Sequence, residues 1–122
     1  TSRSENVFKR FTPNGKYIET IELPSCYICR PVLKNGTLYF AVIVTKDWGT
    51  YDGMLAVLDH KNSVVSFPGG SKPIYSENKL IASTYDQNTF FNPHDVCIDN
   101  DENIYVPQWN SEKTYPLKLT RV

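Results

Sequence analysis

Three cysteines are the residues of this chain with the widest range of chemistry. Cys26 and Cys29 form a Cys-x-x-Cys pair, and Cys97 stands alone. Such a pair can exchange disulfides or bind zinc, but the sequence has no second pair, no histidine at zinc-finger spacing and no helix predicted after the motif. The odd count also disfavours a disulfide framework. We interpret all three as packed or unreactive thiols.

Histidine and acidic residues form a second set of candidate ligands. His94 precedes Asp95 at the predicted start of a strand, where an imidazole can bind a metal or transfer protons near neutral pH. The alternative is that His94 caps the strand through hydrogen bonds to Asp95 or to the backbone. The acidic segment 99–103 has oxygen ligands for calcium, but it lacks the glycine and distal glutamate of an EF-hand and predicts a hairpin turn. We assign no role to His60, which lies in another predicted turn.

Aromatic side chains are grouped in two predicted loops. Trp48 and Tyr51 lie in one loop, and Trp109 lies in the other beside Asn110. Aromatic rings on loops supply a large contact area at a small entropic cost, so they are candidates for a binding surface. Packing between sheets is the alternative. The sequence has no nucleophile elbow, phosphate loop or paired carboxylates, so nothing supports a hydrolase or a kinase.

The elements that position these residues are short strands. Alternating or short apolar runs rich in Val, Ile, Tyr and Phe recur between turn signals, whereas few stretches show a helical period, so the predicted class is all-β. The run Leu38–Val44 is apolar almost throughout, which suits a strand buried on both faces. The predicted strands are 7–11, 17–23, 27–33, 38–44, 54–58, 64–67, 94–98, 104–106 and 117–122.

Charge and length narrow the classes of partner. The 122 residues carry 13 basic and 13 acidic side chains without a run of either sign. This balance lacks the electrostatic footprint of a protein that binds nucleic acid or an anionic membrane. No apolar stretch approaches the roughly 20 residues that span a bilayer. The chain opens without an initiator Met or a signal peptide, as expected for a processed product, an excised segment or an expressed fragment.

The predicted strands repeat a layout along the chain. Aligning Tyr39 with Tyr105, which lie 66 residues apart, places a strand, a turn with Asn, and a loop with Trp and Tyr in the same order twice. We therefore divide the chain at 1–23, 24–67, 68–91 and 92–122: the end of one unit, a full unit, a long connection with a minor hairpin at 76–78, and the start of another unit.

One segment resembles a known repeat. It reads Asn92-Pro-His-Asp-Val-Cys-Ile-Asp-Asn-Asp-Glu-Asn-Ile-Tyr-Val-Pro-Gln-Trp-Asn, and it resembles the NHL repeat, as does the opening hairpin from Val7 to Ile18. Glu102 stands where that family has a turn glycine, and Pro107 follows the Ile-Tyr-Val. The resemblance implies a β-propeller of four-stranded antiparallel blades, in a family that builds six-bladed rings.

The resemblance also implies that this chain holds an incomplete ring. It would supply the last two strands of one blade, all of the next, and the first three of a third, which leaves sheet edges unpaired. If the first strand is redundant, eight strands or two blades remain. Three copies could then close a ring in which residues 17–23 complete a neighbour's blade. The alternative is that a longer chain supplies the remaining blades.

In such a blade, loops and inner-strand starts meet at one end, because successive strands reverse direction. The candidate ligand-binding residues at this end are Arg30, Trp48, Tyr51, His94, Asp95, Trp109 and Asn110, with Cys29 and Asp47 close by. We expect a ligand- or protein-binding scaffold, extracytoplasmic or secreted by analogy with exported repeats of this kind. The alternative is a metal-dependent enzyme similar to the peptide-amidating lyases, with zinc or calcium in the central channel at His94.

Overall fold

The computed structural model describes residues 1–46, 49–84, 89–110, 112 and 115–121, except for the side chain of Ala82. The described residues form small antiparallel sheets, which confirms the all-β class. Their one helical element, η1 (Arg3–Glu5), is a three-residue 3-10 turn. In this part of the chain, no helix has the length and apolarity needed to cross a bilayer.

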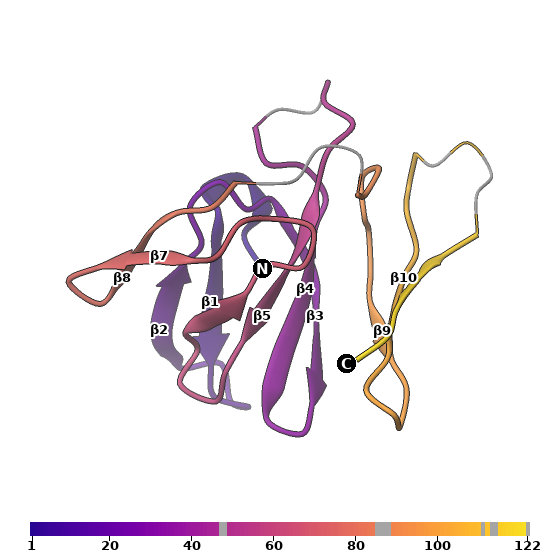
Figure 1. The fold of residues 1–122 in the computed structure, drawn as a ribbon. Coiled ribbons are helices and arrows are strands. Elements are labelled where there is room, and N and C mark those ends of the chain that lie inside the picture. Colours follow the sequence, from indigo (N-terminus) through magenta and orange to yellow (C-terminus); the bar gives the residue numbers. More distant parts are fainter. Residues whose placement is uncertain (47–48, 85–88, 111, 113–114, 122) are drawn as a thin grey trace.

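Three sheets and one hairpin contain all the described strands (Figure 1). In each of them, strands consecutive in sequence are neighbours. The first sheet contains β1 (Val7–Phe11) and β2 (Tyr17–Glu22). The central sheet contains β3 (Ile28–Lys34), β4 (Thr37–Val42), β5 (Met54–Leu58) and β6 (Val64–Ser66). The third sheet contains β9 (Cys97–Ile98), β10 (Ile104–Val106) and β11 (Leu117–Leu119), and the hairpin contains β7 (Ile74–Ser76) and β8 (Lys79–Ala82).

Every predicted strand overlaps a strand of the structure, and three predictions extend two or more residues beyond an observed end. The strand predicted at 94–98 is confined to Cys97–Ile98, because the pairing with the segment after β10 resumes out of register at the Pro93–Gln108 bridge, where His94 N–H donates to the Pro107 carbonyl at 2.9 Å. The strand predicted at 117–122 ends at Leu119, opposite Ile104, the first residue of β10. The strand predicted at 38–44 ends at Val42, although Ile43 N–H still donates to the Tyr27 carbonyl at 3.0 Å.

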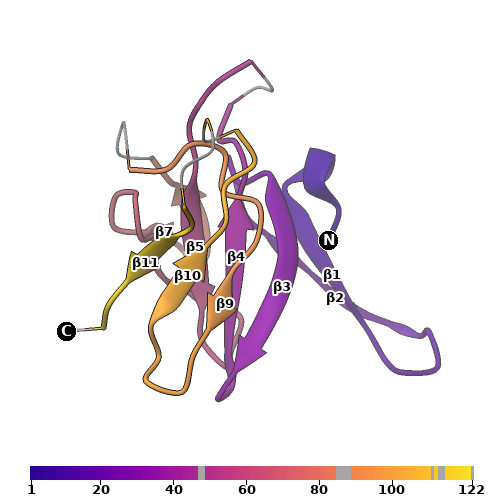
Figure 2. The same cartoon turned by 90° about the vertical axis from the view of Figure 1, so that its right-hand side faces the viewer.

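The central sheet is buried on both faces, as the near-continuous apolar run predicts. In Figure 2 the third sheet lies in front of the central sheet, and the first sheet lies on its other side. Phe40 and Val42 pack in the core that includes residues of the first sheet, whereas Ala41 and Ile43 pack in the core that includes residues of the third sheet. All four are at most 2% exposed. Each large apolar side chain buried in this way contributes about 1.5–3 kcal/mol of transfer free energy. Two separate cores therefore hold the three sheets together, one on each face of the central sheet.

The first strand is an integral part of the first core. Val7 and Phe8 in β1 are 9% and 6% exposed, and the Phe8 ring lies 5.2 Å from the Phe40 ring between centroids. The interpretation of the first strand as redundant is therefore wrong, because its removal would uncover one face of the central sheet.

The central and third sheets pack with equivalent positions side by side. Lys34 donates to Asn100 at 3.2 Å, and Asn35 donates to Glu102 at 3.5 Å. These pairs are 66 and 67 residues apart in sequence, close to the spacing of the aligned tyrosines. The repeated layout recognised in the sequence thus corresponds to neighbouring sheets that pack with their equivalent residues adjacent.

One five-residue turn design occurs three times, at 12–16, 59–63 and 99–103. In each turn, the N–H of the first residue donates to the carbonyl of the fifth, and the N–H of the fourth donates to the carbonyl of the first. The fourth residue has a positive φ: +84° at Gly15, 64° at Asn62 and 62° at Glu102. Glu102 therefore adopts the left-handed conformation that a glycine takes in the first turn.

The hairpin β7–β8 lies within the long connection and confirms the minor hairpin predicted at 76–78. Glu77 and Asn78 at its turn both have positive φ, as a two-residue type I′ connection requires. The Tyr75 hydroxyl donates to the Val64 carbonyl at 3.1 Å and accepts from the Val64 N–H at 2.6 Å. It thereby satisfies both backbone groups of a residue in the outer strand β6.

Candidate binding face at the loop end

The described parts of three connections lie at one end of the sheets, which we call the loop end. They are residues 43–53 between β4 and β5, 89–96 before β9 and 107–110 after β10. Figure 1 shows them at the top, opposite the turns 34–37 and 99–103. The opposite end of the molecule, with these turns, is called the turn end below.

A buried asparagine holds the loop end together. Asn92 is 3% exposed, and its Nδ2 donates to the carbonyls of Ile43 and Thr50, both at 3.0 Å. Its N–H donates to the Asp52 carbonyl at 3.0 Å, and its own carbonyl accepts from Trp109 N–H at 2.9 Å. One residue therefore joins all three connections through hydrogen bonds that exclude water.

The loop between β4 and β5 is closed by a second buried polar contact. Asp52, 3% exposed, accepts from Thr45 N–H at 3.0 Å and from Thr45 Oγ1 at 2.8 Å. Gly53 follows with φ +144°, and a Cβ placed there would lie 2.3 Å from Pro93 Cδ and 2.6 Å from the Val42 carbonyl oxygen. Only glycine lets the chain pass so close to Pro93.

Exposed aromatic rings stand on this rigid base. Tyr51 and Trp109 are 63% and 66% exposed, and Phe91 is 40% exposed. Trp109 N–H donates to the Asn92 carbonyl, and Phe91 directly precedes Asn92 in the chain. Tyr51 lies between Thr50 and Asp52, whose carbonyls accept hydrogen bonds from Asn92. A large apolar area on a fixed backbone loses little entropy when a ligand covers it. The predicted aromatic surface is thus formed by residues tied to one hub.

Arg30 and Asp95, two of the predicted site residues, meet in an ion pair. Arg30 Nη2 lies 2.8 Å from Asp95 Oδ2 and joins the edge strand β3 of the central sheet to the segment before β9. The Arg30 side chain is 67% exposed and the Asp95 side chain 34%. An ion pair this exposed contributes at most about 1 kcal/mol to stability. Its guanidinium remains accessible to an anionic or hydroxyl-bearing group.

His94 and Asn110 are both exposed at the loop end, and Asp47 and Trp48 lie outside the described residues. His94 is tied to the neighbouring connection through its backbone N–H. No group of three or more His, Cys, Asp or Glu side chains that could hold a metal occurs in the described part of the chain. A metal at His94 stays a prediction.

The acidic segment 99–103 forms a hairpin turn whose first carboxylate is fully used within the turn. Asp99 Oδ1 accepts from the N–H groups of Asp101 and Asn103, both at 2.9 Å. Its Oδ2 accepts from Asn103 Nδ2 at 2.8 Å and from the Tyr105 hydroxyl at 3.1 Å. These bonds, the Asn103 side chain first, lower the pKa of Asp99. The predicted hairpin turn accounts for this segment.

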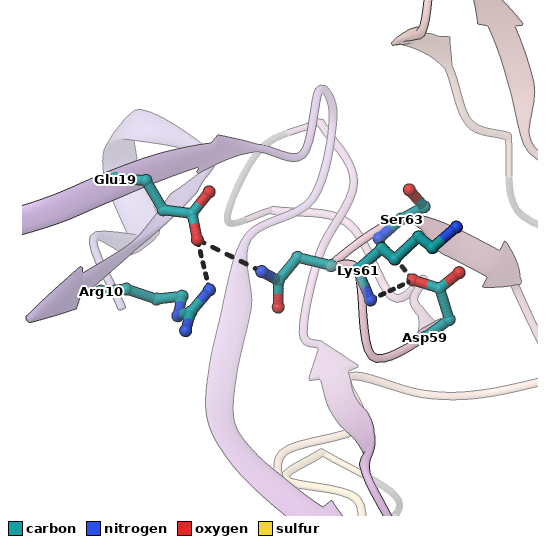
Figure 3. Close-up of polar contacts among 6 residues, drawn as sticks. Arg10, Glu19, Asp59, Lys61 and Ser63 are labelled. Atoms are coloured by element: carbon teal, nitrogen blue, oxygen red, sulfur yellow. Dashed lines mark hydrogen bonds and ion pairs between the residues drawn. The ribbon is translucent and has the colours of Figure 1, made fainter.

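The equivalent turn at 59–63 also joins two sheets (Figure 3). Asp59 Oδ1 accepts from Lys61 N–H at 2.9 Å and from Ser63 N–H at 3.0 Å, and the Ser63 bond is the main reason for the lowered pKa of Asp59. Glu19 of β2 pairs with Arg10 and accepts from Asn62 Nδ2 at 3.3 Å. His60 is exposed in this turn.

The Cys-x-x-Cys pair consists of buried thiols that pack in the two cores. Cys26 and Cys29 are buried free thiols, and each lines a different core. Burial raises the pKa of Cys26 to about 12 and also raises that of Cys29. Thiolates are the reactive form, so neither is poised for redox chemistry. Cys97 is an exposed free thiol, so only the alternative of an unreactive thiol applies to it, and this stays a prediction.

The residues that build the site were not among the sequence candidates. Asn92, Asp52 and Gly53 create the loop end, whereas the candidates were its exposed members. An Asp-Gly pair directly before a strand and an Asn-Pro pair before another were the available signals. Neither signal specifies that the two pairs meet across 40 residues.

Comparisons of the chain with protein-family models, with curated proteins and with solved structures found no match.

Proposed function

We propose that this chain is a segment of an NHL-like β-propeller and serves as a ligand- or protein-binding scaffold, with the loop end as its binding face. Three features support the propeller arrangement: four-stranded antiparallel order in the central sheet, packing of another sheet on each of its faces, and contacts between equivalent positions of neighbouring sheets. An extracytoplasmic location stays a prediction from the resemblance.

The observation that carries the binding function is that exposed aromatic rings lie on backbone segments held by buried hydrogen bonds. Tyr51 and Trp109 expose more than half of their surfaces, yet their backbones are fixed through Asn92. Tyrosine and tryptophan are the residues that supply most binding energy at protein interfaces. Net charge is zero, so the aromatic face and the Arg30–Asp95 pair, rather than a long-range field, would select the ligand.

The experiment is a screen by two-dimensional NMR with a library of tripeptides and a library of disaccharides. Compounds that bind are expected to shift the backbone signals of residues 49–53, 91–95 and 107–110. The double variant Tyr51→Ala/Trp109→Ala should weaken these compounds at least about tenfold, since each lost ring removes about 1 kcal/mol or more.

The matched control is Phe11→Ala/Tyr17→Ala, which removes an aromatic pair of similar exposure, 54% each, on the β1–β2 hairpin. This variant should leave binding unchanged. Binding that maps to the β1–β2 hairpin, or a screen in which neither library perturbs the loop end, would overturn the proposal.

A further inference from the structure

An apolar hollow lies on the central sheet beside β1. It has a volume of about 460 Å³. Leu33 at its wall is 68% exposed. Its apolar lining includes Phe8, Pro31 and Leu38, with Arg10 and His60 also at its wall.

The hollow exists because two strands of the first sheet face four of the central sheet. Among the described strands, β1 pairs only with β2. Its other edge, here called the inner edge, is bridged by Ser2 at Val7 and has no strand beside it from Phe8 to Phe11. Leu33 pairs with Leu38 across β3 and β4, and both therefore lie on the face toward the first sheet. The part of that face around Leu33 and Leu38 is therefore left without a covering sheet.

The equivalent positions one sheet further along are covered. In the third sheet, Ile98 pairs with Ile104, as Leu33 pairs with Leu38 in the central sheet. Both isoleucines pack in the second core, together with Val32 and Tyr39 of the central sheet. Val32 and Tyr39 are themselves a cross-strand pair. The aliphatic pair of Ile98 and Ile104 is thus covered by the pair of Val32 and Tyr39, which contains a tyrosine.

A second cross-strand pair that contains a tyrosine, equivalent to Val32 and Tyr39, lies on the other face of the third sheet. Cys97 pairs with Tyr105 in the third sheet, as Val32 pairs with Tyr39 in the central sheet. This pair lies on the outer face of the third sheet, which faces the viewer in Figure 2, and Cys97 is exposed there. Tyr105 is half-buried there, with Lys118 Nζ 5.4 Å from its ring centroid and its hydroxyl bonded to Asp99.

We propose that a second copy of this chain docks the outer face of its third sheet, at Cys97 and Tyr105, into the hollow at Leu33. The contact repeats between copies the packing of Val32 and Tyr39 on Ile98 and Ile104 within one copy. It joins two different surfaces, so it is heterologous and closes a ring where the rotation between copies allows. The proposal is independent of the binding face.

The docked sheet requires one strand exchange. In the third sheet, β11 lies beside β10. In the docked arrangement, β1 of the other copy takes that position. β11 has three residues, two of them exposed, whereas β1 contributes Val7 and Phe8 to a core. The inner edge of β1 therefore replaces β11 beside β10 of the other copy, and each copy supplies eight strands to two four-stranded sheets.

Sedimentation velocity of the full chain between about 1 and 200 µM tests the proposal. The wild type is expected to form a discrete species larger than the monomer. Leu33→Asp blocks the hollow and Cys97→Arg blocks the outer face, so each variant alone should be monomeric. The control Ile81→Asp, at a residue 54% exposed on the β7–β8 hairpin, should assemble as the wild type does.

Mixing the two blocked variants gives the decisive measurement. Leu33→Asp retains an intact outer face and Cys97→Arg retains an intact hollow, so an equimolar mixture should contain a dimer that neither variant forms alone. Matching circular dichroism and urea midpoints show that both variants are folded. A wild type that is monomeric at every concentration, or a mixture without dimer, would overturn the proposal and leave the binding face untouched.

Discussion

The two ends of the sheets are ordered by different kinds of hydrogen bond. At the turn end, the turns 59–63 and 99–103 satisfy their groups within five residues. At the loop end, Asn92 bonds to Ile43 and Thr50 across 49 and 42 residues. The turns therefore form wherever the local sequence allows, whereas the loop end forms only after the central and third sheets have packed.

This difference has a thermodynamic consequence. A local turn loses little when a distant residue changes, because its bonds close short segments of chain. A buried hub leaves several groups unsatisfied at once when it is removed. Substitutions at the loop end should therefore have larger effects than those at the turn end, and they should also change the candidate binding face.

The largest effect is expected for Gly53→Ala. Its Cβ would lie 2.3 Å from Pro93 Cδ, and φ at this position is +144°, so both contact and backbone would be strained. We expect a loss of about 3 kcal/mol in the free energy of unfolding. Urea denaturation measures it.

The control for this substitution is Gly15→Ala at the turn end. Gly15 also has a positive φ, +84°, but nothing lies within 4 Å of its added Cβ. Backbone strain alone should cost about 1 kcal/mol. Equal losses at the two glycines would contradict the close approach of Gly53 to Pro93.

A smaller loss is expected for Asn92→Ala. The Ile43 and Thr50 carbonyls would lose the Nδ2 donor, the first in a buried site and the second in a partly buried one, at a cost of about 2 kcal/mol. The loops with Tyr51 and Trp109 should also exchange their amide hydrogens faster. Asn100→Ala, which removes a single exposed acceptor of Lys34, serves as control. The hub would be disproved if both variants unfolded at the same urea concentration.

The smallest effect is expected at the turn end and depends on pH. The pKa of Asp99 is lowered in the folded state, so its contribution to stability is present above the unfolded pKa and is lost as pH falls through the folded value. Between pH 5 and pH 2, the Asp99→Asn variant should lose less stability than the wild type in urea titrations. The Asp101→Asn control should follow the wild type, and identical pH profiles for all three proteins would refute the assignment.

The strands and turns were predictable because their signals are local. Alternating apolar and polar residues mark β2, a continuous apolar run marks β5, and Asn35-Gly36 or Asp59 to Asn62 specify turns by their own backbone preferences. Glu102 was recognised as standing in a glycine position, and its φ of 62° shows that the turn geometry prevails over the residue type. Local chemistry thus determined the elements.

The site could be predicted only in part. The exposed members, such as Tyr51, Trp109 and the Arg30–Asp95 pair, follow from the expectation that loops and strand starts meet at one end. Asn92 could not be found in this way, because its partners are backbone carbonyls, and any residue type supplies those. The shortening of β9 was likewise not predictable, because it follows from a register shift between the ladder at Cys97–Ile98 and the Pro93–Gln108 bridge.

The Tyr75 hydroxyl controls the direction in which strands can be added. An additional chain that aligned with β6 would need the Val64 N–H and carbonyl, and one phenol oxygen already engages both. Growth of the sheet into fibrils is therefore obstructed at this edge by a single side chain, while the inner edge of β1 has no described strand beside it from Phe8 to Phe11. The docking proposed above would use that second edge.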